Sequence, residues 1–137
     1  MIEVLVAVLI LSIGLLGMAA LQARALKGNH SSLQRTQAVM LSYYILDAMR
    51  ADRETATSGT FPYNMSKTCA VPVDMSSRIV NAKREWLQAL KDNIGNVDTT
   101  CGTVTCDING ICKIEVHWDD SRAAGGTAEK LETVGRL

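Results

Sequence analysis

Four cysteines carry the most distinctive chemistry in this chain: Cys69, Cys101, Cys106 and Cys112. An even set of cysteines in a small domain is typical of disulfides formed in an oxidising compartment. Four cysteines allow three pairings, so their number alone does not select one.

The hairpin around the Asn-Gly dipeptide helps to choose among the pairings. A strict two-residue turn leaves the flanking thiols out of register, whereas a five-residue loop over 107–111 places Cys106 opposite Cys112. We favour the second register, which pairs Cys106 with Cys112 and leaves Cys69 with Cys101. Each disulfide would contribute about 2 to 4 kcal/mol to a domain with a small core.

A zinc site is the rival interpretation, with Cys101, Cys106, Cys112 and His117 as ligands. The sequence contains no CxxC spacing, which structural zinc sites commonly use. His117 also lies on the strand face opposite to Cys112, because side chains alternate along a strand. The cysteines are therefore expected to form disulfides and to bind no metal.

The remaining chemically active side chains do not predict an active site. His30 and His117 belong to different elements, and no sequence pattern places a nucleophile beside a base. Asp119 and Asp120 offer a cation site together with Glu115, but solvated loop acids are commoner than calcium sites of so few ligands. We expect no enzymatic activity and no cofactor.

Glu3 stands directly before an uncharged apolar run that extends from Val4 to Leu21. A helix over residues 4–23 is long enough to cross a hydrocarbon core. A cleaved signal peptide is the alternative, but such peptides begin with Lys or Arg rather than with an acid. A carboxylate at the edge of a membrane span either lies among the headgroups or has a partner.

The orientation of this span is open, because two rules disagree. Arg24, Lys27 and Arg35 follow the span and would keep the C-terminal side in the cytoplasm under the positive-inside rule. The cysteines favour an oxidising compartment for that same side.

Composition excludes two classes of protein. The chain has 137 residues, with 14 Lys and Arg against 14 Asp and Glu and few aromatic residues. This balance lacks the basic patch of a nucleic-acid-binding protein, so no nucleic-acid partner is expected. The length leaves no room for a large catalytic domain.

The first 54 residues are expected to form one long helix, from near Ile2 to about Arg53. No proline interrupts this segment, and apolar residues recur at helical spacing after the span. Gly14, Gly17 and Gly28 mark positions of bending or close helix approach. The positions expected to face the head are Leu33, Met40, Leu41, Tyr44, Ile45, Ala48 and Met49, and those expected on the other faces are Gln34, Arg35, Gln37, Asp47 and Arg50.

Residues 55–137 are expected to form a small α+β head. An irregular connector over 54–74 precedes a helix that Asp74, Ser76 or Ser77 caps and Gly95 ends. Strand patterns follow at 103–106, at 111–118 and, less regularly, at 130–137. The expected fold class is α+β, with a long N-terminal helix, membrane-spanning in its first half, packed on an antiparallel β-meander.

The stretch MIEVLVAVLILSIGLLG resembles the N-terminal segment of type IV pilins and pseudopilins. Met1, Ile2, Glu3 and Val4 match that motif from its third residue onward. The likeness is greatest to minor pilins of the PilV type, which are pilus modification or assembly proteins, and includes IEVLVA, GLLGM, the helix that bears Trp86, and TCDINGICKIEVHWDDSR.

The resemblance implies a precursor anchored once in the inner membrane, with a periplasmic head, that later enters a pilus filament or its tip. The implied partners are other minor and major pilins, the inner-membrane assembly platform, the lipid bilayer, and a prepilin peptidase acting on the full-length precursor. The family motif places a basic leader ending in Gly and two further residues before the position of Met1, so the resemblance predicts them in that precursor. The kinking proline common in major pilins is absent from the long helix.

In that family, the glutamate at the position of Glu3 is thought to pair with the N-terminal ammonium of a neighbouring subunit. This implies that Glu3 sets the axial register of assembly; the alternative is a solvated headgroup acid. The leading hypothesis is a minor pilin that supports pilus biogenesis, adhesion or twitching motility. A minor pseudopilin of a type II secretion system and a single-span anchored periplasmic binding module remain alternatives.

Overall fold

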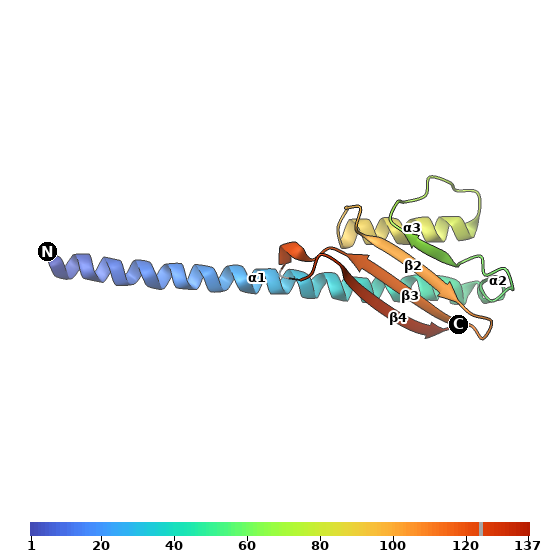
Figure 1. The fold of residues 1–137 in the computed structure, drawn as a ribbon, viewed down its shortest axis with the longest axis horizontal. Coiled ribbons are helices and arrows are strands. Elements are labelled where there is room, and N and C mark those ends of the chain that lie inside the picture. Colours follow the sequence, from blue (N-terminus) through green and yellow to red (C-terminus); the bar gives the residue numbers. More distant parts are fainter. Residues whose placement is uncertain (124) are drawn as a thin grey trace.

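A computed structural model describes residues 1–123 and 125–137, and it has the α+β architecture expected from the sequence (Figure 1). A long N-terminal helix carries a four-stranded antiparallel sheet and a second long helix. The elements in chain order are α1 (Ile2–Ala51), α2 (Arg53–Ala56), β1 (Met65–Thr68), α3 (Arg78–Asn93), β2 (Cys101–Cys106), β3 (Ile111–Trp118), the 3-10 helix η1 (Ser121–Ala123) and β4 (Glu129–Arg136).

Helix α1 consists of a bare arm, residues 2–26, followed by a half that packs on the head (Figure 1). Its 50 residues span about 75 Å at 1.5 Å per residue. No residue of the arm is buried. Gly14, Gly17 and Gly28 do not interrupt the helix, which runs without a break from Ile2 to Ala51.

The face of α1 that packs on the head differs in part from the expected one. Ile45 and Met49 are buried as expected, whereas Leu33, Met40 and Tyr44 are exposed. Gln34, expected on a polar face, is buried and donates from Nε2 to the carbonyl of Ile94. The buried positions are Gln34, Ala38, Ser42, Ile45, Leu46 and Met49.

The prediction failed because α1 carries two apolar faces rather than one. At 3.6 residues per turn, Leu33, Met40 and Tyr44 lie on a line about 150° around the helix from the middle of the buried face. Leu26 falls on the same line, so the exposed residues continue the apolar surface of the arm along the head. We call Leu26, Leu33, Met40 and Tyr44 the outer stripe.

The sheet has the order β1-β2-β3-β4, with every neighbouring pair antiparallel. Strand β1 corrects the expectation of an irregular connector over 54–74, and α2 occupies part of the same segment. The four residues of β1 form an edge and pair with β2, Met65 opposite Val104. Strand β4 lies within one residue of the expected third strand at 130–137, and it pairs with β3 along its whole length.

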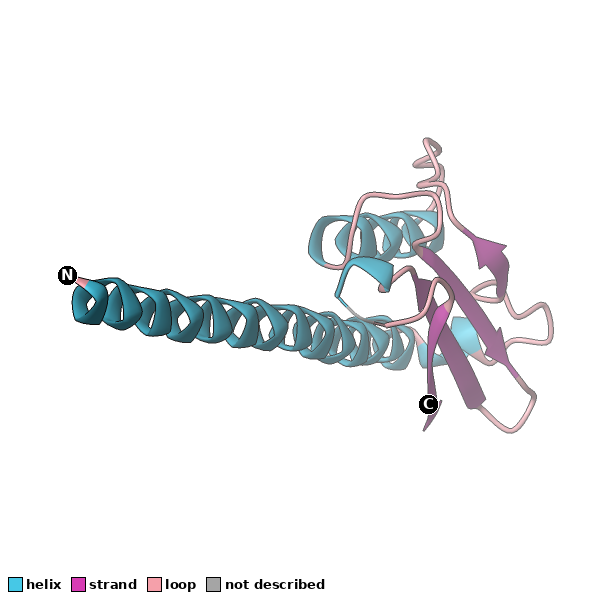
Figure 2. Cartoon of the chain, turned by 60° about the vertical axis from the view of Figure 1, so that its left-hand side comes forward, coloured by secondary structure: helices cyan, strands magenta, loops and turns pink. Residues whose placement is uncertain are grey.

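Helices α1 and α3 cover one face of the sheet, and the other face is open to solvent (Figure 2). Alternate residues of β3, from Cys112 to Trp118, enter the core, as the alternation predicted. The Trp86 indole of α3 donates to the Leu41 carbonyl across a distance of 2.9 Å. Gly102 leaves room for this ring, because a Cβ there would lie 2.5 Å from the Trp86 ring atoms.

Both disulfides join the pairs that the register argument favours. Strand β2 meets β3 with Cys106 opposite Cys112, and five residues, 107–111, separate the two cysteines. The last of the five, Ile111, is already the first residue of β3. Gly110 adopts a positive φ of 74° in this loop, a conformation that glycine tolerates. Cys69 is bonded to Cys101, which ties the segment after β1 to the start of β2.

Helix α3 begins and ends close to the expected residues. Of the three candidate caps, Ser77 is the one whose side chain accepts a hydrogen bond, from the amide of Val80. Asp74 instead accepts hydrogen bonds from Ser76 within the preceding turn. The helix ends at Asn93, and the chain then turns through Gly95 into β2.

Candidate functional site

Glu3 lies in the first turn of α1, at the free tip of the arm. An acid in this position interacts favourably with the positive end of the helix dipole. The side chain is exposed, and within the described part of the chain no ion pair involves it. Any opposite charge that pairs with Glu3 must therefore come from another molecule or from residues that the structure does not describe.

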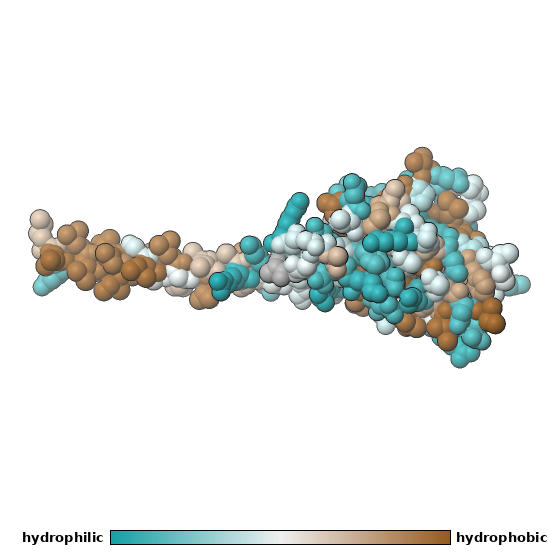
Figure 3. All heavy atoms as spheres, viewed as in Figure 1, coloured by the Kyte–Doolittle hydropathy of each residue, from teal (hydrophilic) through white to brown (hydrophobic). Residues whose placement is uncertain are grey.

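The arm is the part of α1 that is long and apolar enough to cross a membrane, and none of its most apolar window is buried by the head. Figure 3 shows this arm as a brown apolar rod that leaves a largely hydrophilic head. Its apolar side chains are exposed and the described part of the chain does not bury them, so they require lipid or other helices to cover them. Arg24 lies near the end of the arm, and Lys27 comes directly after it, where α1 approaches the head.

The outer stripe extends this exposed apolar surface beyond the arm. Leu26, Leu33, Met40 and Tyr44 recur at spacings of seven, seven and four residues, which places them on one side of α1. All four are exposed. A straight apolar line of this kind on a helix is suited to packing against a second helix.

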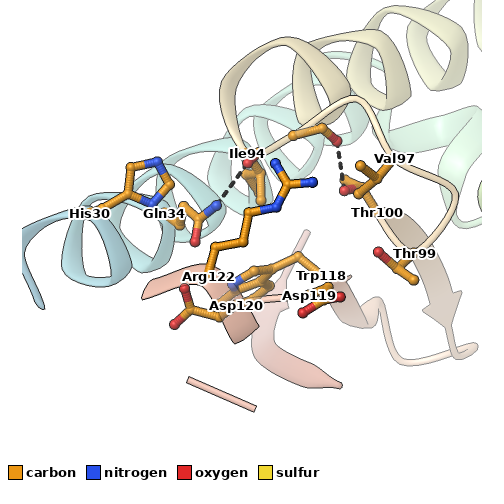
Figure 4. Close-up of a pocket in the computed structure, with 11 residues that line it drawn as sticks. His30, Gln34, Ile94, Val97, Thr99, Thr100, Trp118, Asp119, Asp120 and Arg122 are labelled. Carbon is orange, nitrogen blue, oxygen red and sulfur yellow. Dashed lines mark hydrogen bonds between the residues drawn. The ribbon is translucent and has the colours of Figure 1, made fainter. Parts of the chain in front are cut away.

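A pocket lies where α1 enters the head (Figure 4). Its lining comes from α1, from the turn between α3 and β2, and from the segment that runs from the end of β3 into η1. We call it the neck pocket. Its volume is about 330 Å³. Helix α1 contributes His30 and Gln34, the turn between α3 and β2 contributes Ile94, Gly95, Val97, Thr99 and Thr100, and the end of β3 with η1 contributes Trp118, Asp119, Asp120 and Arg122.

One acid of this pocket, Asp120, is more buried than the sequence predicted. Asp120 was expected to be a solvated loop acid, yet it is only 1% exposed and accepts a hydrogen bond from the hydroxyl of Ser31. Asp119 does match that expectation, since it is more exposed and accepts a hydrogen bond from the amide of Ser121. Hydrogen bonding to the Ser121 side chain, and after it to the Ser121 amide, holds the pKa of Asp119 below its usual value.

Three polar atoms of the neck pocket are buried without a partner in the described part of the chain: Gln34 Oε1, Trp118 Nε1 and Asp120 Oδ1. Their side chains are 7%, 2% and 1% exposed, respectively. Sequence reasoning missed this group because its members are 84 to 86 residues apart along the chain, from Gln34 to Trp118 and Asp120. The one sequence feature that could have indicated this group is Gln34, which lies on a face of α1 whose other buried residues are small or apolar.

The histidines and cysteines considered as catalytic or zinc-binding residues do not come together in the described part of the chain. His117 lies on β3 next to Glu115, with 3.6 Å between Nε2 and the carboxylate, whereas His30 lies on α1 at the neck. Burial, with a contribution from the charge of Lys67, holds the pKa of His117 below its usual value against the opposing effect of Glu115. All four cysteines are in disulfides, and the described residues contain no group of three or more metal-ligating side chains.

Comparison of the chain with protein-family models, with curated proteins and with solved structures finds no match. The features of the molecule that bear on its function are the arm, its acidic tip, the outer stripe and the disulfide-bonded head.

Proposed function

We propose that the chain is a minor pilin of a type IV pilus, anchored by the arm in the inner membrane and later incorporated into the filament. The observation that carries the proposal is the bare apolar arm with Glu3 at its tip, joined to a small disulfide-bonded α+β head. The N-terminal motif that resembles type IV pilins supports the same assignment. The head would lie in the periplasm, an oxidising compartment that suits two disulfides.

In this proposal the arm lies first in the bilayer and later in the core of the filament. Before assembly its apolar side chains lie in the bilayer, and after assembly they pack against the arms of neighbouring subunits. The outer stripe would extend that helix packing along the head. Leu33, Met40 and Tyr44 are exposed in the single chain and would become buried in the filament.

Glu3 would set the axial register of a subunit entering the filament. A lone carboxylate in an apolar filament core is unfavourable by several kcal/mol, because burial removes its hydration. A positive charge from the neighbouring subunit offsets this cost only when the two subunits are in register. Subunits that are out of register would leave the charge unpaired.

The test is piliation in cells that carry Glu3→Ala. The variant should insert into the membrane normally, because removing a charge lowers the cost of insertion, yet it should be absent from the sheared filament fraction. Glu54→Ala is the matched control, since Glu54 is an exposed acid that lies outside the arm. Normal incorporation of Glu3→Ala would contradict the register role.

The same fractions distinguish the alternatives. A single-span binding module would stay in the membrane fraction with or without Glu3, and it would never appear in sheared filaments. A minor pseudopilin would support protein secretion rather than surface piliation.

A further inference from the structure

The two disulfides lie on opposite faces of the sheet. Cys106 and Cys112 are paired across β2 and β3, and both belong to the core that α1 and α3 cover. Cys101 precedes Cys106 by five positions on the same strand, so its side chain emerges on the face that is open to solvent. The register agrees, because Cys101 is directly opposite His117, whose side chain also lies on the open face. The bond between Cys69 and Cys101 is therefore attached to the open face of the sheet.

The two bonds also differ in burial. Cys106 and Cys112 are 6% and 0% exposed, respectively. Cys101 is buried as well, at 1%, but its partner Cys69 is only half-buried. Exchange of a disulfide with a thiol requires that a thiolate reach one of the two sulfurs. Cys69 is therefore the expected point of attack among the four cysteines.

A pocket of about 240 Å³ lies over this bond and is lined by both of its cysteines. We call it the disulfide pocket. Its charged and titratable lining residues are Lys67, Asp98, His117 and Glu129. The Cys69–Cys101 bond therefore adjoins a hollow of the surface, whereas Cys106 and Cys112 pack within the core.

Lys67 supplies the pocket with a positive charge that forms no ion pair within the described part of the chain. Burial and, after it, the charge of Lys67 hold the pKa of His117 below its usual value, so this charge acts close to Cys101. A positive charge attracts an approaching thiolate and stabilises the thiolate that leaves. Of the two acids, Glu129 is paired with Arg35, and Asp98 would repel the same thiolate.

We propose that the Cys69–Cys101 bond is a thiol–disulfide exchange site, which reacts with dithiols in the folded head while the Cys106–Cys112 bond stays closed. One thiolate of the dithiol attacks Cys69 Sγ and forms a mixed disulfide. The bond to Cys101 breaks, and Cys101 leaves as a thiolate that takes a proton from water.

The second thiolate of the dithiol then attacks the dithiol's own sulfur in the mixed disulfide. This step forms the internal disulfide of the reagent and releases Cys69 as a thiolate, which is also protonated by water. Two electrons pass from the dithiol to the cysteine pair, and the reverse reaction with an oxidised dithiol closes the bond again. The exchange does not depend on assembly into a pilus.

Partial reduction followed by alkylation measures the two bonds separately. The full chain in maltoside micelles is treated with dithiothreitol for increasing times, quenched with iodoacetamide and analysed by peptide mass spectrometry. Alkylation of Cys69 and Cys101 should appear at least about tenfold faster than that of Cys106 and Cys112. Equal rates for the two bonds, or faster opening of the hairpin bond, would overturn the proposal.

Urea below the unfolding transition shows whether the reaction takes place in the folded head. Unfolding, which exposes both bonds, becomes more frequent as urea is added, because its free energy falls linearly with urea concentration. The rate at Cys69 and Cys101 should stay nearly constant, whereas the rate at Cys106 and Cys112 should rise. A parallel rise at all four cysteines would show that unfolding admits the reagent, and this would also overturn the proposal.

Charge variants test the route through the disulfide pocket. Lys67→Gln should slow the opening of the bond about two- to threefold at low salt, because it removes a positive charge beside the approaching thiolate. Asp98→Asn should speed it by a similar factor, because it removes a negative charge. Lys27→Gln is the control, since Lys27 is an exposed lysine of α1 that does not line this pocket. Equal rates in these variants and in the unaltered chain would contradict the assigned route.

Discussion

The two disulfides should stabilise the head by different amounts, because they close loops of different length. Cys69 and Cys101 are separated by 32 residues in sequence, and Cys106 and Cys112 by 6. If a disulfide acts by restricting the unfolded chain, the long loop contributes about 3.7 kcal/mol and the short one about 2.2 kcal/mol at 25 °C. The expected difference is about 1.5 kcal/mol in the free energy of unfolding.

The measurement compares oxidised and reduced forms of two single-disulfide variants. Cys106→Ala with Cys112→Ala keeps only the long-loop disulfide, and Cys69→Ala with Cys101→Ala keeps only the short-loop one. Urea unfolding of each variant in maltoside micelles, with and without reductant, isolates one S–S bond, because the side-chain packing is otherwise the same. Equal losses on reduction, or a larger loss for the hairpin disulfide, would refute the chain-entropy reasoning.

Two further substitutions test the core and the open face of the sheet. Gly102→Ala should destabilise the head by about 1 to 3 kcal/mol, because the new Cβ would lie 2.5 Å from the Trp86 ring. The control is Gly59→Ala, whose new Cβ would have nothing within 4 Å. Thermal unfolding should show a lower melting temperature for Gly102→Ala and little change in melting temperature for Gly59→Ala. The pKa of His117 is lowered by burial, so the folded head binds this proton less readily than the unfolded chain, and stability should fall as the pH drops below the usual value of 6.5. His117→Gln should flatten this dependence in melting curves between pH 7 and 5, and an unchanged dependence would assign it to other groups.

The parts of the fold that the sequence predicted well depend on local patterns. The uncharged run after Glu3 predicts the arm by composition alone, and the strict alternation from Cys112 to Trp118 predicts which face of β3 is buried. The pairing of Cys106 with Cys112 followed from the hairpin register, because the two residues are close along the chain. In each case the deciding interactions lie within one element or between neighbouring elements.

The parts that the sequence did not predict depend on contacts between distant segments. Strand β1 has four residues without a clear alternation and forms only by pairing with β2. The two apolar faces of α1 were merged into one because both repeat at helical spacing, and only the packed head shows which one is covered. Asp120 is buried, and its carboxylate accepts a hydrogen bond from Ser31, 89 residues away along the chain.

Site-specific photo-crosslinking from Met40 in assembled filaments tests the central claim most directly. Met40 lies on the outer stripe, so a crosslinker in its place should join this chain to the helix of a neighbouring filament subunit. A crosslinker at Val134, an exposed apolar residue on the edge strand β4, provides the comparison. The account predicts a subunit-to-subunit product from position 40 that depends on Glu3; the absence of that product, or its persistence in Glu3→Ala, would contradict it.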